Sequence, residues 1–125
     1  MAINSRAKGI RFERALCTLL TDMLGVPVTR NWKEQTAVGG YDLEGLPRFA
    51  VEVKACKDIA VNVWWAQTLR QAESCKRIPV LFYKPMQKPW VVVFQSELLA
   101  EDVAGHLVAT TLEAFVDLVR VKKLL

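Results

Sequence analysis

Between Ser5 and Leu24, apolar residues recur every three or four positions, which is the spacing of one face of an α-helix. Gly25 and Pro27 follow as residues that end helices. The pattern therefore predicts an amphipathic helix over residues 5–24. Its apolar face comprises Phe12, Ala15, Leu16, Leu19, Leu20 and Met23.

Three short apolar segments after this helix predict strands, because turn residues separate them. They span residues 26–32, 41–44 and 49–55, with Gly39-Gly40 and residues 45–47 as the turns. Along residues 49–55 the side chains alternate, so Glu52 and Lys54 share one face with Ala50. The opposite face carries Phe49, Val51, Val53 and Ala55.

The next segment predicts a helix that begins at an N-cap residue, Asn62, and runs to about Arg77. We expect it to pack on the sheet. Its apolar face comprises Trp65, Leu69 and Ala72, and its polar face comprises Gln67, Arg70, Gln71 and Ser74.

The rest of the chain predicts two strands and a last helix. Residues 78–83 and 90–94 are continuous apolar runs, typical of strands covered on both faces. Ser96 can cap a short helix that ends before Gly105, and Thr110 with Glu113 forms a capping-box pattern for a helix through about Val119. The order α-β-β-β-α-β-β-α predicts an α/β fold with a mixed β-sheet flanked by helices.

The length of 125 residues and the hydrophobic share of 52% suit one domain with one core, so we expect a single domain over residues 1–125. No run reaches the roughly 18 apolar residues of a membrane helix, and the N-terminus lacks the apolar block of a secretion signal. We therefore expect a cytoplasmic protein without a membrane role. Cys17, Cys56 and Cys75 are odd in number and widely spaced, which favours reduced thiols over disulfides or a zinc site.

The net charge of +4 and the isoelectric point near 9.1 favour a polyanionic partner. Lysine and arginine gain free energy when they displace counterions from phosphates. Many basic proteins bind no nucleic acid, so the charge balance does not identify the partner by itself.

Three charged residues stand where the fold does not require them. If the chain reverses around Pro47, Asp42 lies opposite Glu52, and cross-strand neighbours on one face have Cβ atoms only about 5 Å apart. Two like charges at that distance among apolar neighbours are costly unless a cation lies between them. Oxygen ligands favour Mg²⁺ or Mn²⁺, which can bind a phosphate oxygen and activate a water. Lys54, on the same face, could hold that water or neutralise charge in the transition state.

A simpler interpretation is that Glu52 and Lys54 are a charge pair on a solvated strand face and that Asp42 is a turn residue. Against this, the charges lie in the middle of a hydrophobic strand, where unpaired charges are rare.

Glu13 is also unusually placed. On a helical wheel it falls at the edge of the apolar face, between Leu20 and Leu24, and it can reach the sheet. A third carboxylate there would complete an acidic pocket for one or two divalent ions. The alternative is that Glu13 pairs with a nearby lysine or arginine.

These residues carry a family resemblance. Gly40-Tyr41-Asp42 followed by Glu52-Val53-Lys54 resembles the signature of the PD-(D/E)XK nucleases, with Tyr41 where the motif name has Pro. The opening Ser5-Arg6-Ala7-Lys8-Gly9, leading to Phe12-Glu13-Arg14, resembles small archaeal-type and phage-type Holliday junction resolvases. The resemblance covers about residues 5–84.

The resemblance implies a restriction-endonuclease-like fold and a role for each motif residue. The catalytic residues it implies are Glu13, Asp42, Glu52, Lys54 and Gln67. The ligands of Mg²⁺, for which Mn²⁺ could substitute, would be Glu13, Asp42, Glu52 and Val53. The contacts with DNA phosphates would be Ser5, Arg6 and Lys8, with Arg30, Lys33, Lys57 and Lys84 as further basic candidates.

The hypothesis we place first is a Mg²⁺-dependent endonuclease that resolves four-way or otherwise branched DNA as a twofold homodimer. The alternatives are a nuclease of the same type acting on linear, nicked or flap DNA, a DNA-binding module without catalysis, and a protein-interaction domain. The simpler interpretation of each single lysine or arginine is a solvated side chain, and it is favoured for Lys57 and Lys84 taken alone. Trp64, Trp65 and Trp90 could stack on bases, but their apolar surroundings favour burial, and His106 is expected to be structural or exposed.

Overall fold

The computed structural model describes residues 5–31, 40–55 and 57–125, without the side chains of Ser5 and Arg6. The helices are α1 (Ser5–Leu24), α2 (Val61–Cys75), the 3₁₀ helix η2 (Ser96–Leu98) and α3 (Leu112–Val121). The strands are β1 (Thr29–Arg30), β2 (Leu43–Glu44), β3 (Phe49–Lys54), β4 (Ile78–Tyr83), β5 (Val91–Gln95) and β6 (Leu107–Thr111).

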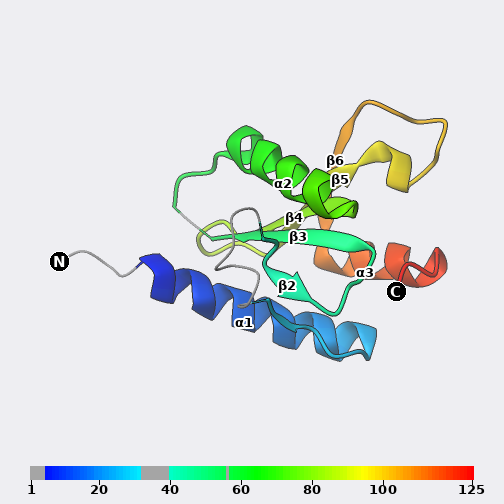
Figure 1. Ribbon diagram of the computed structural model, residues 1–125. Helices are drawn as coiled ribbons and strands as arrows, with labels where there is room; N and C mark the ends of the chain where they lie inside the picture. Colours follow the sequence, from blue (N-terminus) through cyan, green and yellow to red (C-terminus); the bar gives the residue numbers. More distant parts are fainter. Residues whose placement is uncertain (1–4, 32–39, 56) are drawn as a thin grey trace.

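The central sheet has four strands in the order β3-β4-β5-β6 (Figure 1). β3 and β4 run parallel and are joined through α2, whereas β4, β5 and β6 pair antiparallel. β1 and β2 form a separate antiparallel pair. The predicted α/β fold with a mixed sheet flanked by helices is confirmed.

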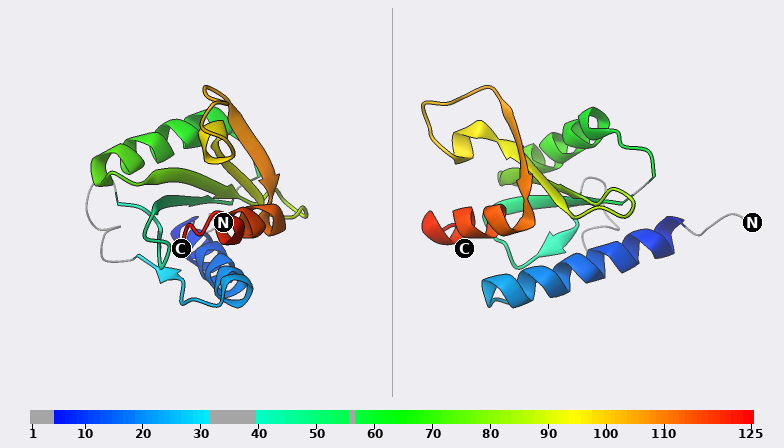
Figure 2. Two further views of the ribbon diagram at one scale, coloured as in Figure 1. Left: turned by 90° about the vertical axis from the view of Figure 1, so that its right-hand side faces the viewer. Right: turned by 180° about the vertical axis from the view of Figure 1, so that it is seen from behind.

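Helices cover both faces of the sheet. Figure 2 shows α2 on one face, with α1 and α3 on the other. The larger core lies on the α1 and α3 side and includes Phe49 and Val51 of β3. On the α2 side, Trp64 and Trp65 pack against Leu81 and other strand residues. The predicted alternation of β3 is therefore confirmed, because its odd-numbered residues enter the larger core.

The buried face of α1 is rotated from the predicted one. Ala15 and Leu19 were expected inside but are exposed, while Cys17 and Leu24 are buried with Leu16 and Leu20. The helix packs through the positions that follow Glu13 at intervals of three, four, seven and eleven residues, namely Leu16, Cys17, Leu20 and Leu24. Glu13 consequently continues the stripe that faces the sheet.

Two predicted strands are shorter in the structure. Of the residues expected in the strand over 26–32, the structure places Thr29 and Arg30 in β1, and Trp32 lies outside the described residues. Pro27 explains part of the difference, since it has no N–H to donate to a ladder. The strand expected over 41–44 begins at Leu43, and the N–H of Asp42 donates to Val51 of β3.

The ends of α2 also differ from the prediction. The N-cap residue is Ala60, which gives no side-chain cap, and Asn62 lies inside the helix. The helix ends at Cys75, followed by Lys76 in the left-handed conformation with φ of 57°. The prediction of an N-cap at Asn62 was therefore wrong, because packing on the sheet determines where this helix begins.

Strand β6 was not predicted. It pairs antiparallel with β5, and its residues are only exposed or half-buried, so the apolar pattern that marks the other strands is weak here. The cap of the last helix is Thr111, whose hydroxyl accepts the N–H of Ala114 (3.1 Å), and not Thr110. The helix expected after Ser96 is the single turn η2.

Among the described residues, none of the helices has the length and apolar content needed to span a membrane.

We predict that Gly45→Ala destabilises the fold. Gly45 follows β2 with φ of 111°, and a Cβ there would collide with the carbonyl oxygen of Pro27. The strained backbone should cost about 1–3 kcal/mol of the free energy of unfolding, with the collision adding to it. Urea denaturation followed by tryptophan fluorescence measures the change.

Gly9→Ala is the matched control. Gly9 lies within α1, and no atom is within 4 Å of an added Cβ. Alanine should therefore raise the free energy of unfolding by about 0.5–1 kcal/mol. A Gly45→Ala protein as stable as the parent would contradict the close approach of the two segments.

Candidate active site

Asp42 is held between β3 and the segment that follows β1. Its N–H donates to the carbonyl of Val51 (2.7 Å), and its Oδ2 accepts the N–H of Val53 (2.7 Å). Its own carbonyl accepts the N–H of Asn31 (2.9 Å). The two bonds to β3 flank Glu52 in the chain, so Asp42 lies beside Glu52 as expected. The ladder of β2 is formed with β1, so these two bonds replace the expected hairpin.

Glu52 lies in the middle of β3, on the face that α2 covers, and is only 3% exposed. Lys54, on the same face, places its Nζ 3.2 Å from Glu52 Oε1. The other carboxylate oxygen, Oε2, is buried without a hydrogen bond from any described residue. Since a buried acceptor without a donor is costly, this oxygen is suited to a cation or a water.

Gln71 is the glutamine of α2 that interacts with the carboxylate of Glu52. Its side chain is 7% exposed, and its hydrogen bond to Glu52 lowers the pKa of that carboxyl. Gln71 was placed on the polar face of the helix, which was wrong, because Trp64, Thr68 and Gln71 together face the sheet. Their i, i+4, i+7 spacing was the signal that could have revealed it. Gln67, the glutamine expected at the site, is half-buried one turn earlier.

Burial raises the pKa of both acids. For Asp42 burial is the largest cause and the charge of Glu52 adds to it, so that the pKa rises to about 8 although the N–H of Val53 opposes the shift. For Glu52 burial again raises the pKa, and Lys54 and Gln71 oppose the increase. Two carboxyl groups in this position favour a proton or a bound cation over two free negative charges.

Glu13 approaches the two acids from α1. Its charge raises the pKa of both Asp42 and Glu52, as expected of a nearby carboxylate. Its Oε1 binds Nε of Arg30 at 2.9 Å. The pairing with an arginine, which the sequence left open, is therefore present. Arg30, expected to contact DNA, is engaged in this ion pair.

The donor set fits a divalent cation in part. The open Oε2 of Glu52 and the raised pKa of Asp42 suit a positive charge, and hard cations prefer oxygen ligands. Across the described ranges, however, no three His, Cys, Asp or Glu side chains gather closely enough to hold a metal ion. Glu13 would have to leave Arg30 to become a third ligand. Val53, also expected to bind the metal, lies directly beside Asp42 through its N–H.

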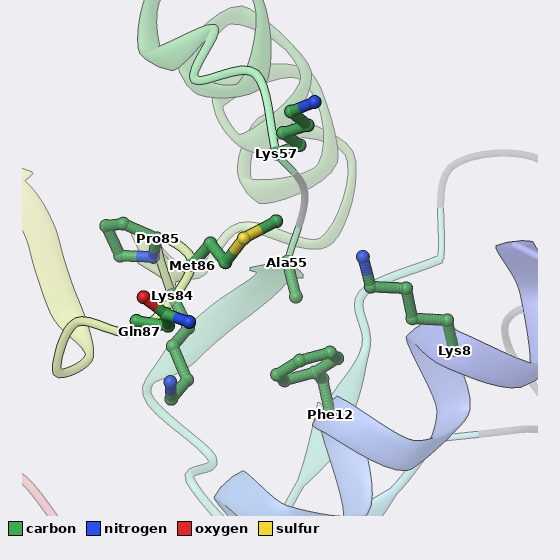
Figure 3. A pocket seen from close by; sticks show the side chains of 8 residues that line it. All are labelled: Lys8, Phe12, Ala55, Lys57, Lys84, Pro85, Met86 and Gln87. Carbon is green, nitrogen blue, oxygen red and sulfur yellow. The ribbon is translucent and has the colours of Figure 1, made fainter.

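Three of the lysines expected to bind DNA line one pocket (Figure 3). Lys8 comes from α1, Lys57 from the segment before α2, and Lys84 from the end of β4. The pocket also touches Ala55, the residue that follows Lys54 at the end of β3. Lys33 and the side chains of Ser5 and Arg6, also expected at DNA, lie outside the described residues.

The remaining aromatic candidates are buried. Trp64, Trp65 and Trp90 are each 7% exposed, which confirms that they belong to the core. His106 is exposed, as expected.

Comparison with known proteins identifies the family. A model of phage putative PDDEXK endonucleases matches residues 4–123. The chain belongs to this family. It is thus a nuclease of the PD-(D/E)XK type, as the motif residues predicted. No curated protein matches the sequence significantly.

A solved structure has the same fold as this PDDEXK chain. It is Archaeoglobus fulgidus Hjc, described as a Holliday junction resolvase from an archaeal hyperthermophile. The TM-score is 0.54 with 21% identity, over 83% of this chain and 94% of that one. At this identity the likeness concerns the fold, and it confirms the restriction-endonuclease-like architecture.

The raised pKa of Asp42 predicts that the metal-free PDDEXK chain loses stability as the pH rises. Folded Asp42 keeps its proton up to about pH 8, whereas an unfolded aspartate loses it near about pH 3.9. The folded state thus binds more protons in this window, and its free energy of unfolding falls across it. Asp42→Asn keeps an acceptor for Val53 and removes the titration. The melting temperature of this variant at pH 8 should exceed that of the parent by about 4 °C or more. This corresponds to about 1 kcal/mol in the free energy of unfolding.

Thermal denaturation followed by circular dichroism measures this difference in the absence of metal. Millimolar Mg²⁺ should then raise the melting temperature of the parent at pH 8 and leave that of Asp42→Asn unchanged. Asp117→Asn, an exposed position on α3, is the control and should behave as the parent. Equal stabilisation of the parent and Asp42→Asn by Mg²⁺ would exclude Asp42 as a ligand.

Proposed function

We propose that this chain is a divalent-cation-dependent endodeoxyribonuclease that hydrolyses phosphodiesters in branched DNA, with the four-way junction as substrate. The observation that carries the proposal is the meeting of Asp42 and Glu52 beside Lys54, with a pocket lined by lysines at the end of the same strand. Family membership supports the nuclease chemistry, and the fold shared with Hjc supports the choice of substrate.

The acidic residues would hold the metal. In this proposal Asp42, Glu52 and the carbonyl group of Val53 bind Mg²⁺ or Mn²⁺, and Glu13 joins them after release from Arg30. Such an ion, when bound, activates a water and neutralises charge on the phosphate.

Lys54 and Gln71 would act on the groups around the acids. The Lys54 side chain is 28% exposed while it contacts Glu52, and an ammonium group has three N–H donors. It can therefore also donate to the attacking water or to a non-bridging phosphate oxygen. Gln71 would favour the ionised form of Glu52, because its hydrogen bond opposes the increase in pKa that burial causes. Gln67, one turn away on α2, is the alternative glutamine for contact with the substrate.

The basic residues would position the DNA. Lys8, Lys57 and Lys84 bind backbone phosphates in this proposal, together with Ser5, Arg6, Lys33 and, once released from Glu13, Arg30. Contacts with phosphates position DNA without reading its sequence, which suits an enzyme that selects structure. Cutting two symmetry-related strands requires two active sites, so we propose that the enzyme acts as a twofold homodimer.

We predict that Asp42→Asn and Glu52→Gln each reduce Mg²⁺-dependent cleavage of a synthetic four-way junction by about a hundredfold or more. Both substitutions remove a charged ligand and keep the shape of the side chain. Binding of the junction, measured by fluorescence anisotropy without metal, should change little. The control Asp117→Asn on α3 should cut the junction at the parental rate. Undiminished cleavage by Asp42→Asn or by Glu52→Gln would contradict the proposal.

Two alternatives give different results in the same assay. Equal cleavage of the junction and of linear, nicked or flap DNA at one salt concentration would indicate a nuclease of the same type with another substrate. Binding of the junction without turnover in Mg²⁺ would indicate a DNA-binding module that lacks catalysis.

A further inference from the structure

The lysine pocket has an apolar lining that a phosphate site does not need. Besides its three lysines it is lined by Phe12, Ala55, Pro85, Met86 and Gln87. None of these lining residues is acidic. Figure 3 shows the Phe12 ring and the Met86 side chain on either side of Ala55, with the three lysines around them on separate segments of the chain. The pocket therefore offers positive charge at its rim and carbon surface within.

The Phe12 ring contacts two neighbouring side chains, Trp90 and Lys8. It makes an edge-to-face contact with Trp90, with ring centroids 6.3 Å apart and an interplanar angle of 76°. Nζ of Lys8 lies 6.0 Å from the centroid of the same ring. A fixed aromatic ring beside a cation is the arrangement on which nucleic-acid bases stack.

Met86 projects from a tight turn between β4 and β5. It is 59% exposed, although a large apolar side chain gains by leaving water. The N–H of Lys88 donates to the carbonyl of Pro85 (3.2 Å), and Gln87 adopts a left-handed φ of 59°, so the backbone of the turn is well defined. Apolar side chains, including methionine and proline, are used by DNA-binding proteins as wedges beside unstacked bases.

We propose that this pocket binds the base of an unpaired nucleotide at the branch point of the substrate. The base lies between Phe12 and Met86, and Lys8, Lys57 and Lys84 bind the flanking phosphates. The proposal rests on the proposed function in taking DNA as the ligand. Ala55 directly follows β3, the strand that carries Glu52 and Lys54, so the pocket lies at the C-terminal end of that strand.

The size of the pocket limits how the base is held. Its volume is about 110 Å³, below the roughly 150 Å³ of a cavity that encloses benzene. The base is therefore only partly enclosed, and contact with its face tolerates any sequence.

The test compares two DNA duplexes in the absence of metal. One carries a single unpaired nucleotide, and the other carries an abasic site at the same position, which keeps the backbone and removes the base. The parent protein should bind the first about fivefold more tightly, the lower end of what stacking of one base contributes. Met86→Ala should abolish this preference while changing the affinity for the abasic duplex less than about twofold.

Two further variants serve as controls in the anisotropy titrations. Val103→Ala removes another exposed apolar side chain, 48% exposed and outside the pocket, and should keep the preference. Lys84→Gln should weaken binding of both duplexes equally and reduce the salt dependence by about one counterion.

Equal affinity of the parent for the two duplexes would overturn the proposal. An equal loss of affinity for both duplexes in Met86→Ala would also overturn it, because such a loss would indicate that Met86 contacts only the DNA backbone. Cleavage of the four-way junction in Mg²⁺ is measured separately. If the parent protein prefers the unpaired base but does not cut the junction, the proposed function is contradicted and the proposal for the pocket stands. If it cuts the junction without preferring the unpaired base, only the proposal for the pocket is contradicted.

Discussion

The hydrogen bond from the N–H of Val53 to the carboxylate of Asp42 is the contact on which the site depends. β3 lies at one edge of the four-stranded sheet, where backbone groups that point outward need partners. Asp42 supplies both an acceptor and a donor there, at Val53 and at Val51. The backbone N–H and the side chain of Asp42 thus together take the place of a neighbouring strand. The same contact brings the carboxylate of Asp42 beside Glu52.

This arrangement is unfavourable in one respect, because it brings the negative charges of Asp42 and Glu52 together at a buried site. Burial raises the pKa of both Asp42 and Glu52, and the nearby charge of Glu13 adds to the effect. Lys54 and Arg30 each offset one carboxylate through an ion pair. These contacts do not compensate all of the negative charge of the acids, so a proton or a bound cation would stabilise the site.

Local sequence patterns were sufficient for β3 and its charges. The alternation of Phe49, Val51 and Val53 fixed which way Glu52 points, and the structure agrees. The patterns failed where contacts distant in sequence decide the outcome. β6 forms because β5 pairs with it, although its own residues carry little apolar signal. Gln71 faces inward because α2 rests on its Trp64 face, which polarity by itself did not indicate.

The sequence also left the partner of Glu13 undecided, and the structure makes that choice informative. A phosphate approaching Asp42, Glu52 and Glu13 meets negative charge, so the basic groups around them must attract it. Arg30 is already bound to Glu13, and Lys54 to Glu52. Under the proposed function, Lys8, Lys57 and Lys84 would therefore receive DNA before a metal is shared with it, because none of the residues that line their pocket is acidic. In the order of events that this proposal implies, the phosphate would compete with Glu13 for Arg30, and the binding of DNA would release the third carboxylate to the metal.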